Sequence, residues 1–163
     1  MHEALHRMID DTDAEILELL QENARIAQAE VARVVGLAPS AVLERIRKLE
    51  ARGVIKGYAA LVDPHAVDQS MLAFVAVRSD EAIGDDRVAL ALAKCPEVLE
   101  LHHVAGDDCY LLKVRARDAE HVGRLLRHRF GRIAGVRSTR TTIVLETVKE
   151  TPRIPLRLSE AQR

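Results

Sequence analysis

The segment HHVAGDDCYLLKVRA, residues 102–116, places two histidines, two aspartates and a cysteine within eight positions. These groups could bind a metal ion through mixed N, O and S ligands, or a thiol could act as a nucleophile beside an imidazole base. If residues 98–104 form a strand, His102 and His103 point to opposite faces and cannot chelate one ion. A dyad of Cys109 with either imidazole stays open, but no second group of Cys and His lies nearby. We therefore expect no metal, no cofactor and no catalytic residue in this segment.

The composition is that of a globular protein: 163 residues, 48% of them hydrophobic, are enough for one domain core or two small ones. Two cysteines, Cys95 and Cys109, form no CxxC motif, which is typical of reduced thiols in a cytosolic protein. No apolar run reaches the roughly 18 residues that span a bilayer, and the acidic start MHEALHRMIDDTDAE lacks the apolar core of a signal peptide. We expect a cytoplasmic protein without a membrane partner. Because the net charge is only −1, any affinity for nucleic acid must come from a local basic patch.

Apolar residues recur at helical spacing between Asp10 and Arg52, which predicts three short helices. Asp10 is expected to cap the first helix, with Asp13 in its first turn, and Ser40 is expected to cap the third. The segments NARIAQ and GLAPS separate the helices. The apolar positions that define the helices are Ile16, Leu17 and Leu20, then Val31, Val34 and Val35, then Val42, Ile46 and Leu49.

After Gly53 the apolar pattern changes from helical to extended. VIKGYAALVD looks extended, and DPHAVDQS is a polar connector that contains proline. We therefore expect an N-terminal domain over residues 1–62, a linker over 63–70, a second domain over 71–150 and a partly loose tail over 151–163.

The second domain shows the order strand, helix, strand, strand, helix, strand. The segments are MLAFVAV, DRVALALAKC, VLELHHV, YLLKVRA, AEHVGRLLRHRF and a long last strand VRSTRTTIVLETVK. This βαββαβ order predicts an α+β, ferredoxin-like domain, an antiparallel sheet with both helices on one face. The open face of so small a sheet is expected to pair with a second copy, which gives a homodimer.

The stretch AEVARVVGLAPSAVLERIRKLEARGVIKGY has the spacing of a helix-turn-helix. Ala32, Gly36 and Val42 match the small residue, the turn residue and the packing residue that two closely packed helices require. If Val42, Ile46 and Leu49 face the core, the opposite face of the third helix would enter the major groove of double-stranded DNA. That face carries Ser40, Glu44, Arg47 and Lys48, flanked by Arg45 and Arg52.

Residues 44–57 supply the local basic patch, with five basic and two acidic side chains. Arg47 is the candidate for a guanine contact, because a guanidinium can bond O6 and N7 together. The expected phosphate contacts are Arg45, Arg52 and Lys56. The alternative is an ordinary solvated helix in which Glu44 and Lys48 pair at i,i+4. GVIKGY forms either a short wing or the start of the linker.

From about Ile9 to Lys149 the chain resembles the Lrp/AsnC (feast/famine) family of transcriptional regulators. The resemblance rests on four segments in the family's order and spacing: IDDTDAEILELLQENARI, VGLAPSAVLERIRKLEARGVIKGYAALVDP, VAGDDCYLLKV and IAGVRSTRTTIVLETVK. It implies an N-terminal winged helix-turn-helix, a connecting strand, and a C-terminal effector-binding domain that dimerises through its sheet. It also implies assembly into higher even-numbered oligomers, often octamers, and control of DNA binding by a small effector, expected to be an amino acid.

The resemblance also implies a role for the loop of the opening segment. Family members carry Gly-Asp-x-Asp there, in an amino-acid pocket between dimers with the last strand nearby. On this chain the loop side is Gly106, Asp107 and Asp108, with Cys109 in place of the family's final Asp, and the strand side is Ser138, Thr139 and Thr141. An amino acid needs a carboxylate for its ammonium group and N–H or O–H donors for its carboxylate. With Cys109 in the loop, the ammonium contact passes to Asp107 or Asp108, unless both carboxylates only cap backbone N–H groups of a turn.

Two other functions stay open. Some tetrapyrrole decarboxylases resemble the same family, and His102, His103 and Arg115 could bind porphyrin carboxylates. The basic third helix argues against this enzyme. The other alternative is an architectural DNA-binding protein that responds to no effector.

Overall fold

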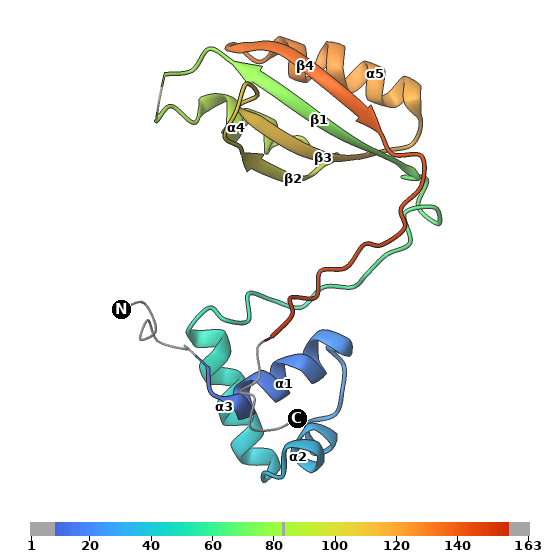
Figure 1. The fold of residues 1–163 in the computed structure, drawn as a ribbon. Helices are drawn as coiled ribbons and strands as arrows, with labels where there is room; N and C mark the ends of the chain where they lie inside the picture. The colour runs from blue at the N-terminus through green and yellow to red at the C-terminus, as the bar shows by residue number, and fades with distance from the viewer. Residues whose placement is uncertain (1–8, 83, 157–163) are drawn as a thin grey trace. The chain divides into compact units, whose positions relative to one another are not determined.

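The computed structural model describes residues 9–82 and 84–156. The chain forms two compact units, Met1–Ala60 with Glu150–Arg163, and Leu61–Lys149. The first unit consists of helices and the second of a sheet with its helices (Figure 1). Among the described residues, no helix has both the length and the apolar character needed to cross a membrane.

Three helices make up the first unit: α1 (Asp11–Glu22), α2 (Gln28–Val35) and α3 (Pro39–Ala51). Asp10 caps α1 as predicted: its Oδ1 accepts a hydrogen bond from Asp13 N at 2.7 Å, and the Asp13 carboxylate accepts one from Asp10 N at 3.5 Å. Gly36 ends α2 with φ of 68°, a left-handed conformation that glycine adopts without steric cost.

The predicted cap of α3 is wrong. Ala38 is the N-cap residue and Pro39 is the first residue of the helix, so Ser40 lies within the first turn and bonds no backbone N–H there. Proline suits this first position, because its fixed φ is helical and the N–H that it lacks would have no partner in the helix.

The core of the first unit consists of the apolar faces of its three helices. Val42, Ile46 and Leu49 face inward as predicted, with 0%, 8% and 1% of their surface exposed. Val42 and Ile46 pack with Ile16 and Val31 in one buried cluster. Val34, which also fits the helical pattern, is 49% exposed and lies outside the core.

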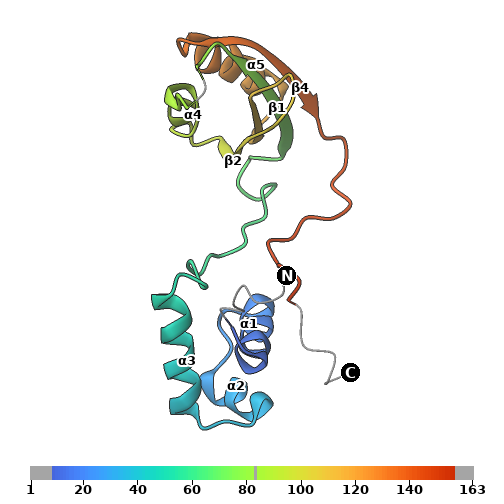
Figure 2. The same cartoon turned by 60° about the vertical axis from the view of Figure 1, so that its left-hand side comes forward.

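The second unit has the predicted βαββαβ order. Its elements are β1 (Met71–Ser79), α4 (Arg87–Leu92), β2 (Val98–His103), β3 (Tyr110–Ala116), α5 (Ala119–His128), the 3-10 turn η1 (Phe130–Arg132) and β4 (Val136–Ile143). The strands form an antiparallel four-stranded sheet in the order β2-β3-β1-β4. Leu92 of α4 and Leu125 of α5 share one buried cluster with Val75 and Leu112 of the sheet, so both helices cover the same face (Figure 2).

Two expectations about extended segments fail in the described chain. Residues 54–62, where the resemblance implied a connecting strand, form no strand: Val54 and Ile55 bend back to bond Leu49 O, and residues 56–62 belong to no helix or strand. β4 ends at Ile143 rather than near Lys149, because its partner β1 begins at Met71 and the last ladder bond joins Val144 N to Leu72 O at 3.0 Å. Beyond that bond, β1 offers no residue for β4 to pair with.

The tail, expected to be partly loose, is held at Ile154. Gln21 of α1 donates a hydrogen bond to Ile154 O at 3.0 Å and accepts one from Ile154 N at 2.7 Å. This reciprocal pair satisfies both backbone groups of one tail residue. Residues 157–163 of the predicted tail lie outside the described residues.

Candidate functional site

The outward face of α3 carries the polar residues that the helical spacing places there. Ser40, Glu44, Arg47 and Lys48 are exposed, and so are Arg52 and Lys56 beyond the helix. Lys48 Nζ lies 2.6 Å from Glu44 Oε1, so the expected i,i+4 pair forms, and the hydrogen bond from Lys48 lowers the pKa of Glu44. Both side chains are about two-thirds exposed, at 66% and 67%, so water competes with this pair and it can open for a ligand. Arg47 makes no ion pair with any described residue, and its five N–H donors are available.

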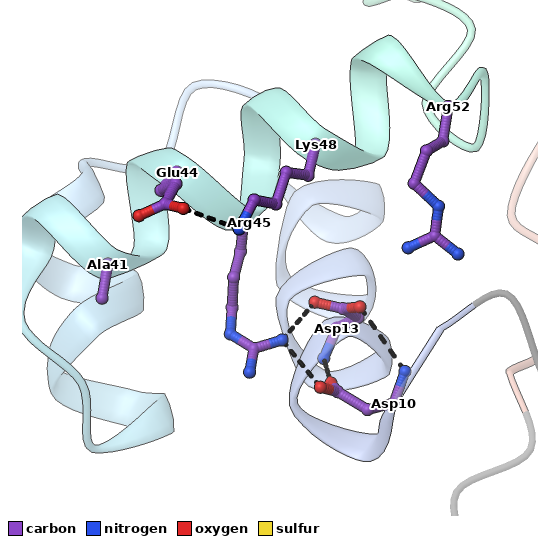
Figure 3. Close-up of a pocket in the computed structure, with 7 residues that line it drawn as sticks. All are labelled: Asp10, Asp13, Ala41, Glu44, Arg45, Lys48 and Arg52. Carbon is purple, nitrogen blue, oxygen red and sulfur yellow. Dashed lines mark hydrogen bonds and ion pairs between the residues drawn. The ribbon is translucent and has the colours of Figure 1, made fainter.

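Arg45 has different surroundings from its neighbours on α3. Its Nη1 lies 2.8 Å from Asp10 Oδ2 and 2.7 Å from Asp13 Oδ1, at the start of α1 (Figure 3). These two hydrogen bonds raise the pKa of the guanidinium against the desolvation that would lower it. Burial would raise the pKa of Asp10, but the hydrogen bonds from the Asp13 backbone and from Arg45 outweigh it and the pKa is lowered. Arg45 therefore joins α3 to α1, and its guanidinium is occupied within the unit.

A surface hollow of about 340 Å³ surrounds this bridge (Figure 3). Its charged lining combines three carboxylates with three cations, so it does not favour a ligand of either sign. Its residues are Asp10, Asp13, Ala41, Glu44, Arg45, Lys48 and Arg52. We interpret the hollow as the space around the bridge and not as an effector site.

In the loop before β3, Asp108 forms an ion pair across the sheet. Asp108 Oδ2 lies 2.6 Å from Arg140 Nη2 of β4, with 30% of the Asp108 side chain and 72% of the Arg140 side chain exposed. Asp107 is exposed, and neither aspartate accepts a hydrogen bond from a backbone N–H of the described chain. The two carboxylates therefore do not cap backbone N–H groups of a turn, as the alternative interpretation of this loop required. Gly106 has φ of 132°, which lets the loop turn where a side chain would be strained.

Cys109 faces the backbone of β1. Its Sγ accepts a hydrogen bond from Ser79 N at 3.4 Å and lies 3.7 Å from Ser79 O, while its own N–H bonds Val77 O at 2.9 Å. The thiol is half-buried and packs beside the core. Cys109 therefore extends the β1–β3 pairing. Because its thiol bonds the Ser79 backbone, it is not available to the loop carboxylates.

On β4 the predicted residues divide between the two faces of the sheet. Thr139 and Thr141 lie opposite Val77 and Val75, which belong to the core beneath the helices. Ser138 lies on the open face, two positions before Arg140. The structure thus brings Ser138, Arg140 and Asp108 to one face and directs the two threonines to the other. The site predicted from the sequence does not include Arg140. Two features of the sequence could have indicated it: Arg140 lies two positions after Ser138, so both face the same side of the strand, and its charge is opposite to that of Asp108.

The histidines of the opening segment lie on opposite faces, as predicted. His103 contacts the buried Tyr110 with ring centroids 5.2 Å apart, whereas His102 lies on the open face with its Nε2 3.4 Å from Glu100 Oε2. Arg115, near the far end of β3, donates to Ser70 O at 3.4 Å. The three groups proposed for a tetrapyrrole do not converge. Within residues 9–82 and 84–156, no three His, Cys, Asp or Glu side chains could hold a metal ion.

The open face of the sheet has an apolar centre. Leu72, Phe74 and Ala76 of β1 alternate with the core residues and so face away from the helices, beside Leu111 of β3. Charged groups surround this centre, among them the pair of Lys113 Nζ and Glu100 Oε1 at 2.9 Å. An apolar centre with a polar rim is the anatomy of a protein interface.

Comparison with known proteins decides the family. Residues 72–154 match the model of the Lrp/AsnC ligand binding domain, and residues 9–56 match that of a winged helix-turn-helix DNA-binding domain. The chain belongs to the Lrp/AsnC family. The leucine-responsive regulatory proteins of Escherichia coli K12 and Salmonella typhimurium are each 40% identical to it over 151 residues, which covers 91% of this chain and 92% of theirs.

Solved structures of Lrp/AsnC regulators superpose on most of the chain. A transcriptional regulator from Neisseria meningitidis in complex with L-methionine gives a TM-score of 0.85 at 32% identity, covering 90% of this chain and 96% of that one. A feast or famine regulatory protein from Mycobacterium tuberculosis, complexed with L-methionine, gives 0.82 at 36% identity, with coverage of 89% and 97%. These likenesses confirm the predicted family and the predicted pairing of a winged helix-turn-helix with a ferredoxin-like domain. The protein is accordingly an Lrp/AsnC-type DNA-binding transcription regulator.

Proposed function

We propose that this Lrp/AsnC protein reads double-stranded DNA with α3 and responds to an amino acid that binds beside Asp108 and Arg140. The observation that carries the effector site is the Asp108–Arg140 ion pair, with oxygen and nitrogen 2.6 Å apart at the edge of the open face. An amino acid carries both charges of this pair. Its ammonium group would bond Asp108 and its carboxylate would bond the guanidinium fork of Arg140.

An effector that binds in this way replaces one ion pair with two. The free protein keeps its site closed by the Asp108–Arg140 bond, and the zwitterion inserts between the two side chains. Asp107 and the backbone N–H of Gly106 add contacts from the loop, and Ser138 adds a hydroxyl from β4. Thr139, Thr141 and Cys109 support this face from behind. The relatives are named for leucine or solved with methionine, so an apolar amino acid is the class to test first.

For DNA, we propose that Arg47 contacts a base and that Arg52 and Lys56 contact phosphates. Ser40, Glu44 and Lys48 belong to the same outward face, and the Glu44–Lys48 pair opens when the helix enters the groove. Arg45 acts as a positioning residue through Asp10 and Asp13, so the predicted phosphate contact of Arg45 gives way to this role.

We further propose a homodimer joined through the open sheet face, with dimers associating into an even-numbered assembly such as an octamer. The apolar centre formed by Leu72, Phe74, Ala76 and Leu111 supports the first step. The protein would act in the cytoplasm, on chromosomal DNA, as a regulator and not as an enzyme.

A thermal-shift screen of the twenty amino acids tests the effector site. A ligand at 100 times its Kd stabilises the folded state by about 2.7 kcal/mol, which raises the Tm by about 11–22 °C for a unit of this size. Asp108→Asn and Arg140→Gln should each abolish the shift given by the best amino acid. Glu120→Gln, which breaks the exposed Arg124–Glu120 pair on α5, should keep it. The proposed site is refuted if the two variants respond like the parent.

A further inference from the structure

The arginines of the effector-binding unit are concentrated in one stretch. Residues 121–140 contain six arginines and no aspartate or glutamate, in a chain whose net charge is −1. Residues 44–57, around the helix that reads DNA, contain five basic and two acidic side chains. The effector-binding unit therefore carries a stretch that is more basic than the recognition helix, and the proposed effector site uses only Ser138 and Arg140 of it.

Three of these arginines are neutralised within the unit. Arg124 Nη1 lies 2.6 Å from Glu120 Oε1, Arg137 pairs with Asp80, and Arg140 pairs with Asp108. The other three, Arg127, Arg129 and Arg132, are exposed and pair with no carboxylate of the described residues. His128 between them is also exposed.

These three arginines lie within six consecutive residues, from the last turn of α5 to the 3-10 turn η1. Phe130 is fully buried and fixes the turn after α5, while Arg129 and Arg132 on either side of it remain at the surface. Burial raises the pKa of the Cys95 thiol, and the charge of Arg129 opposes this, which places Arg129 near the end of α4. Lys94, next to Cys95, is exposed and likewise has no ion pair with a described residue.

Helix electrostatics explains only part of this arrangement. A cation in the last turn of α5 stabilises the helix dipole, and Arg127 satisfies that need. Arg132 lies beyond the helix, and like charges kept close together without counter-charges repel one another. Such a surface is stabilised when an anion binds to it.

We propose that Arg127, Arg129 and Arg132, with Lys94, form a second DNA-binding surface that contacts the phosphate backbone without reading bases. A guanidinium presents two parallel N–H donors that match two phosphate oxygens. None of residues 121–140 is an exposed large apolar side chain, so this surface lacks the apolar core that a protein interface usually has, whereas exposed arginines suit a phosphate backbone. DNA bound by α3 stays close to the same molecule, so its effective concentration at the second surface is high.

Salt dependence of DNA binding tests this surface on the full-length protein. The probe is a labelled random-sequence duplex of about 150 base pairs, roughly one persistence length, because phosphate contacts need no particular sequence. The slope of log affinity against log salt changes by about 0.9 for each phosphate contact. The triple variant Arg127→Gln, Arg129→Gln, Arg132→Gln should therefore lower the slope by about 2.7 for each protomer in contact with DNA, and weaken binding at least tenfold at low salt.

Two further variants separate a contact from a general charge effect. Replacing the same three arginines with lysine keeps the charge and should keep the slope. Replacing Arg87, Arg117 and Arg124 with glutamine changes the net charge equally but removes arginines that are paired with Asp85, Asp118 and Glu120, and should leave the slope near that of the parent. Circular dichroism confirms that each variant is folded.

Two results would overturn the proposal. The first is a glutamine triple variant with the slope and affinity of the parent; if that variant also lost binding to polyglutamate, the surface would serve an acidic protein instead. The second is an equal loss in the variant of the paired arginines. Neither result bears on α3, because substitutions there change which sequence is preferred and these measurements use random DNA.

Discussion

Replacing Arg45 with methionine removes the guanidinium that joins α3 to α1 and keeps most of the apolar length of the side chain. Asp13 is 10% exposed, so its carboxylate would remain almost out of water without a counter-charge. Loss of one partner costs about 3–5 kcal/mol for a buried ion pair and up to about 1 kcal/mol for an exposed one. Since Arg45 is 34% exposed and Asp10 is 55% exposed, we expect the free energy of unfolding to fall by about 2 kcal/mol.

Urea denaturation followed by circular dichroism at 222 nm measures this loss, because α1, α2 and α3 dominate the helical signal. Arg33→Met is the matched control: it breaks an ion pair with Glu30 in which the side chains are 71% and 48% exposed, and should leave the midpoint almost unchanged. Adding Asp13→Asn to Arg45→Met should recover part of the loss, because no buried charge is then left unpaired. If Arg45→Met and Arg33→Met denature alike, the bridge does not position α3 and this account of it is wrong.

Three other predictions concern DNA, assembly and pH. Arg47→Ala should change sequence preference by about 1–3 kcal/mol at one base pair, whereas Lys56→Ala should weaken binding to every duplex and lower the salt slope by about 0.9; equal behaviour of the two in competition assays would contradict the assignment. Phe74→Asp should give a monomer by light scattering, because a charge in the apolar centre of the open face prevents its burial, and an unchanged mass would exclude that face as the interface. The pKa of Asp10 is below its ordinary 3.8, so its contribution to stability is complete above about pH 4 and is lost as the pH falls through the folded-state value; the parent should lose stability more steeply than Arg45→Met in this range, and parallel curves would argue against the bridge.

Much of the fold follows from local rules, which is why the sequence predicts it. Asp10 and Asp13 are three positions apart and meet within one turn of helix, so the cap of α1 can be recognised without any tertiary contact. The change from a helical to an alternating apolar pattern after Gly53 depends only on neighbours in sequence. The βαββαβ order then leaves few arrangements, because antiparallel strands and one-sided helices are the usual way to build a core from it.

The errors arise where a distant partner decides the outcome. β4 ends at Ile143 because β1 begins at Met71, and nothing within the sequence of the last strand marks that limit. Arg140 meets Asp108 from 32 positions away, and Arg45 turns from the DNA-facing side toward carboxylates at the start of α1. Side-chain pairing across a sheet or between helices requires the register, which the sequence alone does not provide. The separation of Ser138 from Thr139 was predictable, however, because adjacent residues of any strand face opposite ways.

Cys109 lies where the family carries an aspartate, and this difference changes which residues of the proposed site can bind an ammonium group. A carboxylate at position 109 would place a negative charge beside the ammonium group of an effector, and the side chain of Cys109 has no carboxylate to do so. Here the thiol bonds the Ser79 backbone, a need that neutral sulfur satisfies without a counter-ion. At the proposed site, recognition of the ammonium group would then depend on Asp108, and the affinity for an effector would depend on how readily Asp108 leaves Arg140. The strength of that one ion pair would therefore set the effector concentration at which the regulator responds, because every amino acid bound at this site would first have to separate it.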